Sequence, residues 1–311
     1  MTLHTIEPER RTLHGHFSRD MQPVLTIDPG DTVRFRTLDA GWGLEGRQAD
    51  GEPRKKFEPR TDDDSGHALC GPVFIKGAKP GMTLSVHIDD IRVGSYGWTG
   101  AGGWSTPLND RLKVSELPEF SLQWTLNAAA MNGTDQFGHT VSLHPFMGVM
   151  GMPFDVPGKQ PTPPPRITGG NMDCKELVVG TTLYLPIAVE GGLFSTGDGH
   201  AAQGDGEVSE MAIEAPMERC ELTFDLLPDM HLTTPRANTP AGWITLAFHE
   251  NLDEAIGIAL DAMLDLMKEF YGYERQMALA LASVVAEVRI TQLVNAGVRG
   301  VHVLLPHGAI R

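Results

Sequence analysis

The chain has few cysteines, no long hydrophobic run and no basic cluster, and each absence excludes a class of protein. Its three cysteines, Cys70, Cys174 and Cys220, are widely spaced, so they form neither a disulfide framework nor a CxxC metal motif. Charge or glycine interrupts every apolar run well before the ~18 residues that a membrane-spanning helix needs. The N-terminus also lacks the apolar segment of a secretory signal. We therefore expect a cytoplasmic protein with no membrane partner.

Basic residues and nucleotide-binding motifs are also scarce. The 25 Lys and Arg residues face 40 Asp and Glu residues, so the net charge is −15 and no basic cluster is present to neutralise phosphates. The sequence contains no GxGxxG or GxxxxGK[ST] phosphate motif and no GxSxG nucleophile elbow. We therefore expect no nucleic-acid partner, and the pattern disfavours a nucleotide cofactor and serine-hydrolase chemistry.

Glycine and proline, by contrast, are abundant. The chain holds 35 Gly and 22 Pro, which favours many short elements joined by turns. Apolar or alternating runs predict strands at residues 24–27, 32–36, 72–75, 83–88, 177–179, 182–189, 222–226 and 243–247. Strands therefore dominate the first 250 residues.

Helical spacing of apolar residues is found near the C-terminal end. Residues 252–270 show it, with Asn251 as a suitable N-cap and Gly272 as a suitable terminator. A second helix is predicted from about residue 274 to residue 294, and a closing strand at residues 301–305. We therefore predict an α+β, predominantly β fold. It is expected to be a single domain of residues 1–311, in which an antiparallel β-sandwich or barrel-like body (1–250) precedes a helical block (251–296).

The densest polar segment is GDGHAAQGDGE, residues 197–207. Asp198, His200 and Glu207 supply carboxylate and imidazole ligands that suit zinc or a similar divalent ion. Asp198 and His200 share a face if this stretch is extended. The alternative is a tight Asp/Gly turn whose side chains cap their own backbone.

Other residues are weaker candidates. In GGNMD, residues 169–173, Asn171 and Asp173 could bind an amide or a metal ion, or could form a turn that enters a strand. Glu214 ends an apolar run, where a carboxylate is either solvated or paired. His14, His16 and His144 are lone imidazoles, for which a structural role is the commoner one. Cys174 precedes Lys175 and Glu176, the residue types of Glu-Lys-Cys amidases, but consecutive strand residues face opposite sides.

Several motifs together resemble the acetamidase/formamidase family. They are PVLTIDPGDTV (23–33), GPVFIKGAKPG (71–81), HPFMG (144–148), GGNMD (169–173), the 197–207 segment and Ile213-Glu214, with further similarity at 281–283 and 289–292. The sequence differs from the usual family pattern at Met82 and at Glu287, which is placed in the last predicted helix. The resemblance implies a β-rich fold, hydrolysis of a short aliphatic amide to carboxylate and ammonia, a bound metal ion and a homo-oligomer.

The resemblance and the spacing together lead to a hypothesis for the site. Asp173, Asp198, His200 and Glu214 bind a divalent ion, with Zn²⁺ preferred and Ca²⁺ as the alternative. Glu207 is the general base, Asn171 holds the amide and His144 contributes to substrate binding. The competing hypothesis is a non-catalytic β-rich binding module with a structural calcium in the 197–207 loop. Residues 173–254 carry 15 of the acidic residues and 3 of the basic ones, so the negative charge is concentrated around the proposed site.

Overall fold

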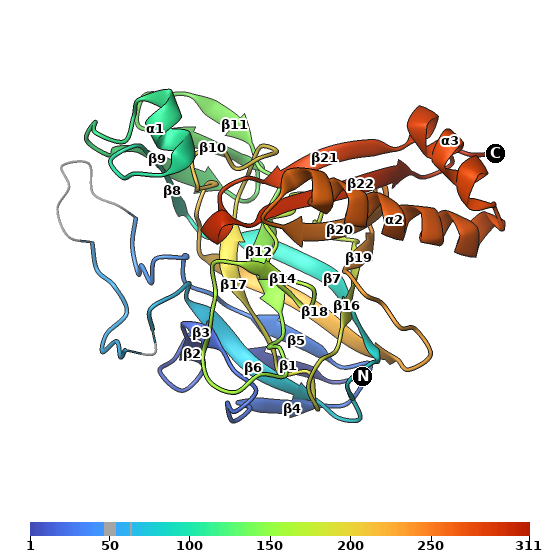
Figure 1. Ribbon diagram of the computed structural model, residues 1–311. Helices are drawn as coiled ribbons and strands as arrows, with labels where there is room; N and C mark the ends of the chain where they lie inside the picture. Colours follow the sequence, from blue (N-terminus) through green and yellow to red (C-terminus); the bar gives the residue numbers. More distant parts are fainter. Residues whose placement is uncertain (47–53, 63) are drawn as a thin grey trace.

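Two large β-sheets form the body of the protein in a computed structural model, which describes residues 1–46, 54–62 and 64–311 (Figure 1). The described strands are β1 (Leu3–Ile6), β2 (Leu13–His14), β3 (His16–Phe17), β4 (Leu25–Ile27), β5 (Thr32–Phe35), β6 (Leu69–Ile75), β7 (Thr83–Val93), β8 (Tyr96–Ala101), β9 (Phe120–Asn127), β10 (Asn132–Asp135), β11 (Thr140–Ser142), β12 (Phe146–Gly151), β13 (Gln160–Pro161), β14 (Pro165–Arg166), β15 (Gly169–Asn171), β16 (Thr182–Pro186), β17 (Phe194–His200), β18 (Met217–Leu227), β19 (Arg236–Asn238), β20 (Gly242–His249), β21 (Glu287–Gln292) and β22 (Arg299–Pro306).

The larger sheet has nine strands in the order β1-β5-β18-β7-β16-β19-β20-β22-β21. A seven-stranded sheet contains β14-β15-β12-β17-β6-β2, with β4 beside β6. Two smaller sheets, β11-β10-β9-β8 and β13-β3, complete the described set. The pairing is antiparallel except where β1 meets β5 and β4 meets β6. The predominantly β prediction is confirmed, and the sheets are open rather than closed into a barrel.

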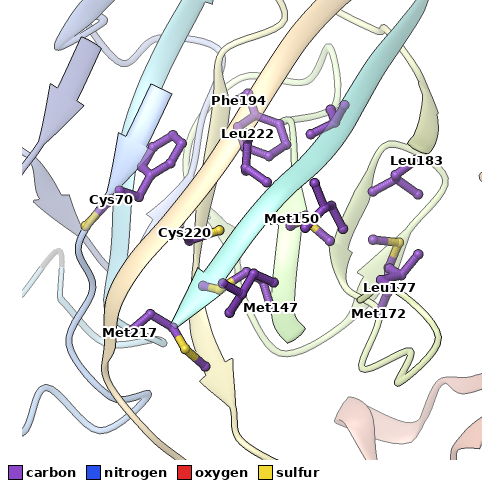
Figure 2. Packing of buried hydrophobic residues seen from close by; sticks show 14 of the residues in the cluster. Cys70, Met147, Met150, Met172, Leu177, Leu183, Phe194, Met217, Cys220 and Leu222 are labelled. Carbon is purple, nitrogen blue, oxygen red and sulfur yellow. The ribbon is translucent and has the colours of Figure 1, made fainter. Parts of the chain in front are cut away.

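The hydrophobic core lies between the two large sheets. It takes alternating residues from β7 and β18 on one side and buried residues of β6, β12 and β17 on the other. Phe194 of β17 meets Phe224 of β18 edge to face, with ring centroids 5.0 Å apart. Figure 2 shows part of this packing, in which Met147, Met150 and Cys220 meet between strands of both sheets. The core therefore holds the seven-stranded sheet, which carries the site, against the nine-stranded one.

Most of the predicted strands are present, and one is wrong. Seven strands overlap the predicted runs, and they are β4, β5, β6, β7, β16, β18 and β20. β5 also shows the half-buried alternation that its sequence indicates. Residues 177–179 instead form a turn, in which the backbone of Leu177 donates to Cys174 and that of Thr181 to Val178. This run is short and fully apolar, and periodicity does not distinguish such a run from a buried loop.

The C-terminal block contains α2 (Leu252–Tyr271) and α3 (Arg275–Val285), whereas α1 (Pro107–Leu112) lies beside the small sheet (Figure 1). Asn251 caps α2 through backbone donors of Asp253 and Glu254, and Gly272 ends it in the left-handed region, as predicted. The second predicted helix is too long: α3 ends at Val285, and β21 follows it. Residues 287–292 contain Val288, Ile290 and Thr291, whose β-branched side chains favour a strand, and they pair with β22. β22 confirms the closing strand.

No helix in the described part of the chain is long and apolar enough to cross a membrane. Whether the chain is a single domain stays a prediction.

His14 is a buried structural residue that is expected to make the fold acid-sensitive. Its Nδ1–H donates to the carbonyl of His16 (2.7 Å), so Nε2 accepts from the hydroxyl of Ser195 (3.0 Å). Burial lowers the pKa of His14 from 6.5 to about 4. The unfolded chain therefore takes up this proton first as the pH falls below 6.5, and stability is lost progressively down to about pH 4.

We expect this group to lower the free energy of unfolding by about 3 kcal/mol between pH 7 and pH 4. Urea unfolding of the wild type and of His14→Gln at several pH values measures it. The variant should show a shallower loss in this range, and an identical pH slope in both proteins would contradict the assignment.

Candidate functional site

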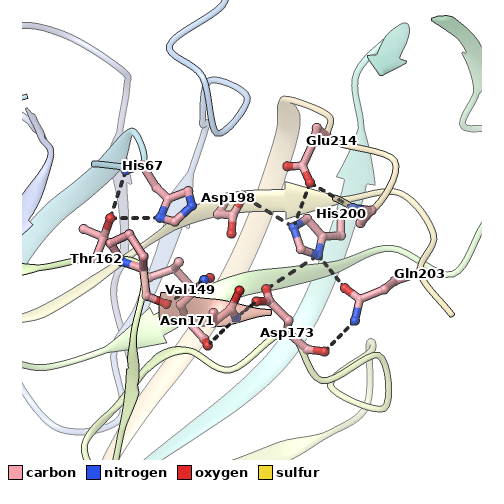
Figure 3. Close-up of polar contacts among 12 residues, drawn as sticks. His67, Val149, Thr162, Asn171, Asp173, Asp198, His200, Gln203 and Glu214 are labelled. Atoms are coloured by element: carbon pink, nitrogen blue, oxygen red, sulfur yellow. Dashed lines mark hydrogen bonds and ion pairs between the residues drawn. The ribbon is translucent and has the colours of Figure 1, made fainter. Parts of the chain in front are cut away.

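Three neighbouring strands of the seven-stranded sheet bring the predicted site residues together. β15 pairs with β12, and β12 pairs with β17. Asp173 follows β15, while Asp198 and His200 lie two residues apart on β17 and point the same way (Figure 3). Glu214 comes from a later segment that bridges to His200, and Glu207 reaches the same place from the turn after β17. The predicted convergence of Asp198 and His200 is therefore present, although the backbone of Asp198 itself is not extended (φ 57°).

These five side chains form one buried cluster. Nε2 of His200 lies 3.3 Å from Oδ1 of Asp198 and 3.5 Å from Oε1 of Glu214. Ligand atoms of Asp173, His200 and Glu207 lie within 4.8 Å of one another, as do those of Asp198, His200 and Glu214. Each of the five residues is at most 5% exposed. The cluster therefore contains two overlapping groups, with His200 in both, that could hold a metal ion.

The electrostatics of the cluster favour a bound cation. Burial raises the pKa of Asp173 to about 6 and that of Glu214 to about 7. Burial, together with the charge of Asp173, raises the pKa of Glu207 well above its usual value. Burial alone would lower the pKa of His200, but the charges of Glu214 and Asp198 raise it well above 6.5. Four carboxyl groups thus compete for one imidazole, and a divalent cation would relieve the repulsion among them.

Several buried oxygen atoms of the cluster lack a hydrogen-bond donor, and this bears on whether a cation fits the site. Four buried oxygens around His200 make no hydrogen bond, and they are Oδ1 of Asn171, Oδ1 of Asp173, Oε2 of Glu207 and Oε2 of Glu214. Buried acceptors are normally satisfied by a donor or an ion. Oxygen and imidazole nitrogen are suitable ligands for zinc and similar divalent ions. The residues present therefore fit a metal ion.

Gly148 of β12 leaves space for these oxygens. A Cβ atom at this position would lie 2.5 Å from Oδ1 of Asp173, 2.7 Å from Oδ2 of Asp198 and 2.9 Å from Cε1 of His200. Met147 and Val149, on either side of it, pair with Gly199 and Gly197, so Gly148 stands beside Asp198. Glycine is required here for close approach, since any side chain would occupy the space between the carboxylates.

Gln203 determines which nitrogen of His200 is available. Nε2 of Gln203 donates to the carbonyl oxygen of Asp173 (2.8 Å), so its Oε1 must face His200, where it accepts from Nδ1 (2.9 Å). Nδ1 therefore carries a proton, and Nε2 points toward Asp198 and Glu214, where a bound cation would take the place of the second proton of the imidazolium. Of the two overlapping groups, the one with Asp198 and Glu214 is thus the better cation site. Asp173 and Glu207 remain beside it as a carboxylate pair.

We expect Gln203→Leu to weaken metal binding by roughly 10- to 100-fold, because an outer-shell partner of a ligating histidine would be lost. Competition with a chelator of known affinity measures this. Gln203→Glu keeps an oxygen acceptor for Nδ1 and should retain more of the affinity than Gln203→Leu. Wild-type affinity in Gln203→Leu would contradict the tautomer assignment.

Three of the residues that supply the clustered carboxylates have a strained backbone conformation. Asp173, Asp198 and Glu207 have φ values of 48°, 57° and 44°, in the left-handed region that non-glycine residues rarely adopt. Each such residue costs on the order of 1–3 kcal/mol and persists where surrounding structure imposes it, which is common at functional sites. The concentration of this strain on three site residues supports a functional role.

Two further residues join the site without any local signal in the sequence. Asn295, in the short 3₁₀ turn η1 (Asn295–Gly297), donates to Oδ2 of Asp173 and to the carbonyl of Asn171. His67 lies beside Asp198 and bonds to Thr162 through Nδ1 (Figure 3), and its charge lowers the pKa of both Asp173 and Asp198. Gln203, in contrast, lies inside the 197–207 segment, where its amide could have been identified.

Asn171 has one free polar atom in the cluster, and His144 lies outside the cluster. Nδ2 of Asn171 donates to the carbonyl of Pro163 (3.0 Å), so only its unpaired Oδ1 is free, and this atom can accept an N–H but cannot donate to a carbonyl. His144 is exposed and lies on the wall of an adjacent cavity of about 630 Å³, outside the cluster. Gln203 and Ala202 line the same cavity, whose other walls include Trp124, Val141, Val178, Met211 and Ile213.

Cys174 is poorly placed as a nucleophile. It is fully buried, and burial together with Glu176 raises the pKa of its thiol well above the usual value. Lys175 pairs instead with Asp205 at 2.9 Å. A buried thiol of high pKa is largely un-ionised and therefore unreactive. Glu287, which was expected in a helix, is instead the first residue of β21. Its side chain is exposed and pairs with Arg289.

The fold and the site together define a mostly β protein in which a buried imidazole and several carboxylates can hold a metal ion. Residues 3–158 and 156–239 match the Acetamidase/Formamidase family. The match covers well over half of the 311 residues, so the chain belongs to this family and the resemblance seen in the motifs is confirmed.

Individual relatives agree with this membership. An acetamidase from Mycolicibacterium smegmatis is 48% identical over 63% of this chain and 61% of its own length. A formamidase from Methylophilus methylotrophus is 24% identical over 63% of this chain and 60% of its own length. The chain thus spans about three fifths of each of these two relatives. The crystal structure of an acetamidase from Bacillus halodurans matches with a TM-score of 0.83 at 24% identity, covering 97% of each chain, and shows a shared fold.

Proposed function

We propose that this protein is an amidohydrolase that cleaves a short aliphatic amide of the formamide or acetamide kind to a carboxylate and ammonia. Its family and the names of its relatives support this class of reaction. The observation that carries the proposal is the set of buried, unpaired oxygens of Asp173, Glu207 and Glu214 around His200. Such an arrangement is suited to a cation and to proton transfer, and is costly without either.

The proposed ligands are Asp198, Glu214 and Nε2 of His200, with Asp173 beside them. Zinc is preferred, because the donor set includes imidazole, and calcium, which favours oxygen ligands alone, is the alternative. A divalent cation held there would polarise the amide carbonyl and lower the pKa of a water molecule toward ~7. Gln203 keeps His200 in the tautomer that this requires.

The remaining polar groups are suited to proton transfer and orientation. Oε2 of Glu207 is buried and unpaired, so Glu207 is proposed to take a proton from the attacking water and to deliver it to the departing nitrogen. Oδ1 of Asn171 can accept an N–H of the amide. Hydrolysis then balances as amide plus water giving carboxylic acid and ammonia, and the acid passes its proton to ammonia to leave carboxylate and ammonium. His144 is proposed to contribute to substrate binding from the wall of the cavity.

Ammonia release from formamide, acetamide and longer amides, with and without prior removal of metal by a chelator, tests the proposal. We expect release that disappears on metal removal and returns when zinc is added. No release from any amide would contradict the proposed reaction. Release that survives complete metal removal would contradict the role of the cation.

The non-catalytic calcium module is not supported by any relative. A homo-oligomeric state and a cytoplasmic location stay predictions, which size-exclusion chromatography with light scattering and cell fractionation test.

A further inference from the structure

A second group of metal-ligating side chains lies outside the cluster described above. Cys174 and Glu176 belong to the segment between β15 and β16, and His302 lies in the middle of β22. Their Sγ, carboxylate oxygen and ring nitrogen lie within 4.8 Å of one another. Cys174 and His302 are 0% exposed, and Glu176 is 9% exposed. Residues far apart in the sequence thus bring a sulfur, an oxygen and a nitrogen ligand to one buried point.

The orientation of each side chain directs a ligand atom inward. Nδ1 of His302 bonds to Oγ1 of Thr291 (2.8 Å), which leaves Nε2 facing Glu176. Nε2 lies 3.4 Å from Oε2 of Glu176, yet it makes no hydrogen bond. The thiol of Cys174 donates a hydrogen bond to the same oxygen (3.7 Å). One carboxylate oxygen therefore has the thiol on one side and the imidazole on the other.

An ordinary buried ion pair accounts for only part of this arrangement. Arg289 donates to Oε1 of Glu176 at 2.8 Å, which satisfies that oxygen and orients the carboxylate. It does not reach Nε2 of His302, a fully buried nitrogen without a hydrogen-bond partner. Unpaired buried polar atoms are uncommon and costly in native proteins. An ion between the three atoms would give Nε2 of His302 a partner and would replace the hydrogen bond between Sγ of Cys174 and Oε2 of Glu176 by two bonds to the metal.

We propose that Cys174, Glu176 and His302 form a second cation site that takes a thiophilic divalent ion such as Zn²⁺. Thiolate, imidazole and carboxylate are established zinc ligands, and a three-residue set leaves a fourth position for water. Glu176 lines the adjacent cavity, from which that water can enter. Binding displaces the thiol proton of Cys174, which passes to solvent. The thiol distinguishes this site from the His200 cluster, whose ligands are oxygen and nitrogen only.

The site would join two parts of the fold. Cys174 immediately follows Asp173, and His302 belongs to the nine-stranded sheet. A metal bridge between them would fasten the segment that carries Asp173 to β22. The second site is therefore structural in effect, and it does not depend on the proposed amidase reaction.

Cobalt titration of the metal-free, full-length protein tests the proposal. Co²⁺ bound to a thiolate gives a near-ultraviolet charge-transfer band, whereas Co²⁺ bound to oxygen and nitrogen alone does not. We expect the band in the wild type and its loss in Cys174→Ser. Cys220→Ser is the matched control, because Cys220 is also 0% exposed but belongs to β18, and it should keep the band. Absence of the band in the wild type, or its persistence in Cys174→Ser, would overturn the proposal.

A second measurement uses only the wild-type protein, so its result does not depend on whether a variant folds. X-ray absorption of the zinc-loaded wild type should show a sulfur neighbour at about 2.3 Å from zinc, and oxygen and nitrogen neighbours alone would overturn the proposal. Amide turnover enters neither readout, so failure of this site and failure of the proposed reaction are distinguishable.

Discussion

His200→Ala is expected to remove both the bound cation and amide turnover. The loss in kcat/KM should be roughly 10⁴-fold, which corresponds to about 5.5 kcal/mol in the barrier. His200 belongs to both groups of ligand atoms in the cluster, and its Nε2 is the nitrogen nearest to Asp198 and Glu214. Its loss leaves four mutually repelling carboxyl groups without the imidazole that faces Asp198 and Glu214.

Metal content by elemental analysis and ammonia release under saturating amide check this result together. His14→Gln is the control, because His14 is equally a buried histidine but does not belong to the cluster. At neutral pH it should retain metal and turnover. Full activity in purified His200→Ala would show that the proposed mechanism is wrong, and loss of both properties in His14→Gln would assign the effect to folding.

Gly148→Ala is expected to lower kcat/KM by about 10²-fold, since displacement of catalytic groups by an ångström has effects of this size. The added methyl group would lie 2.5 Å from Oδ1 of Asp173 and 2.7 Å from Oδ2 of Asp198, so both carboxylates must move. The backbone of Gly148 is not in the left-handed region, and the fold should therefore survive with a cost of about 1–3 kcal/mol for overpacking.

Gly133→Ala separates the loss of activity from the effect of overpacking. Its Cβ would lie 2.9 Å from Cδ2 of Leu126, at the end of a flexible side chain in the small sheet. It should lose some stability in urea unfolding but keep its turnover and metal content. If Gly148→Ala retained wild-type turnover and metal affinity, the space beside Gly148 would have no role in the site.

Local sequence predicted those parts of the structure that depend on neighbouring residues. The alternation of Thr32, Val33, Arg34 and Phe35 places apolar side chains on one face of β5, because strand side chains alternate with a period of two. Asn251 and Gly272 bound α2 through interactions within a single turn. Asp198 and His200 were also expected on one face of a strand, and they do converge, but Asp198 reaches His200 from a left-handed backbone that the period of two does not describe.

Long-range pairing decided the elements for which local signals conflict. Residues 287–292 follow a genuine helix without a glycine or proline between them, but Val288 and Ile290 alternate as in a strand, and the segment pairs with β22 at the edge of the nine-stranded sheet. Hydrogen bonds to β22 and the β-branched residues of this segment act in the same direction. Residues 177–179 are as apolar as a strand, but their backbone groups make turn hydrogen bonds, from Leu177 to Cys174 and from Thr181 to Val178.

The sequence by itself therefore determined a β-rich fold, a C-terminal helix and the residue types of an imidazole–carboxylate site, since composition and short-range periodicity depend only on nearby residues. Only the tertiary structure decided which groups meet there. It brought Asn295 to Asp173, opened the space at Gly148, placed His144 on a cavity wall and used Gln203 to select the tautomer of His200. Distances between residues remote in the chain follow from sheet pairing and core packing, and no local pattern contains them.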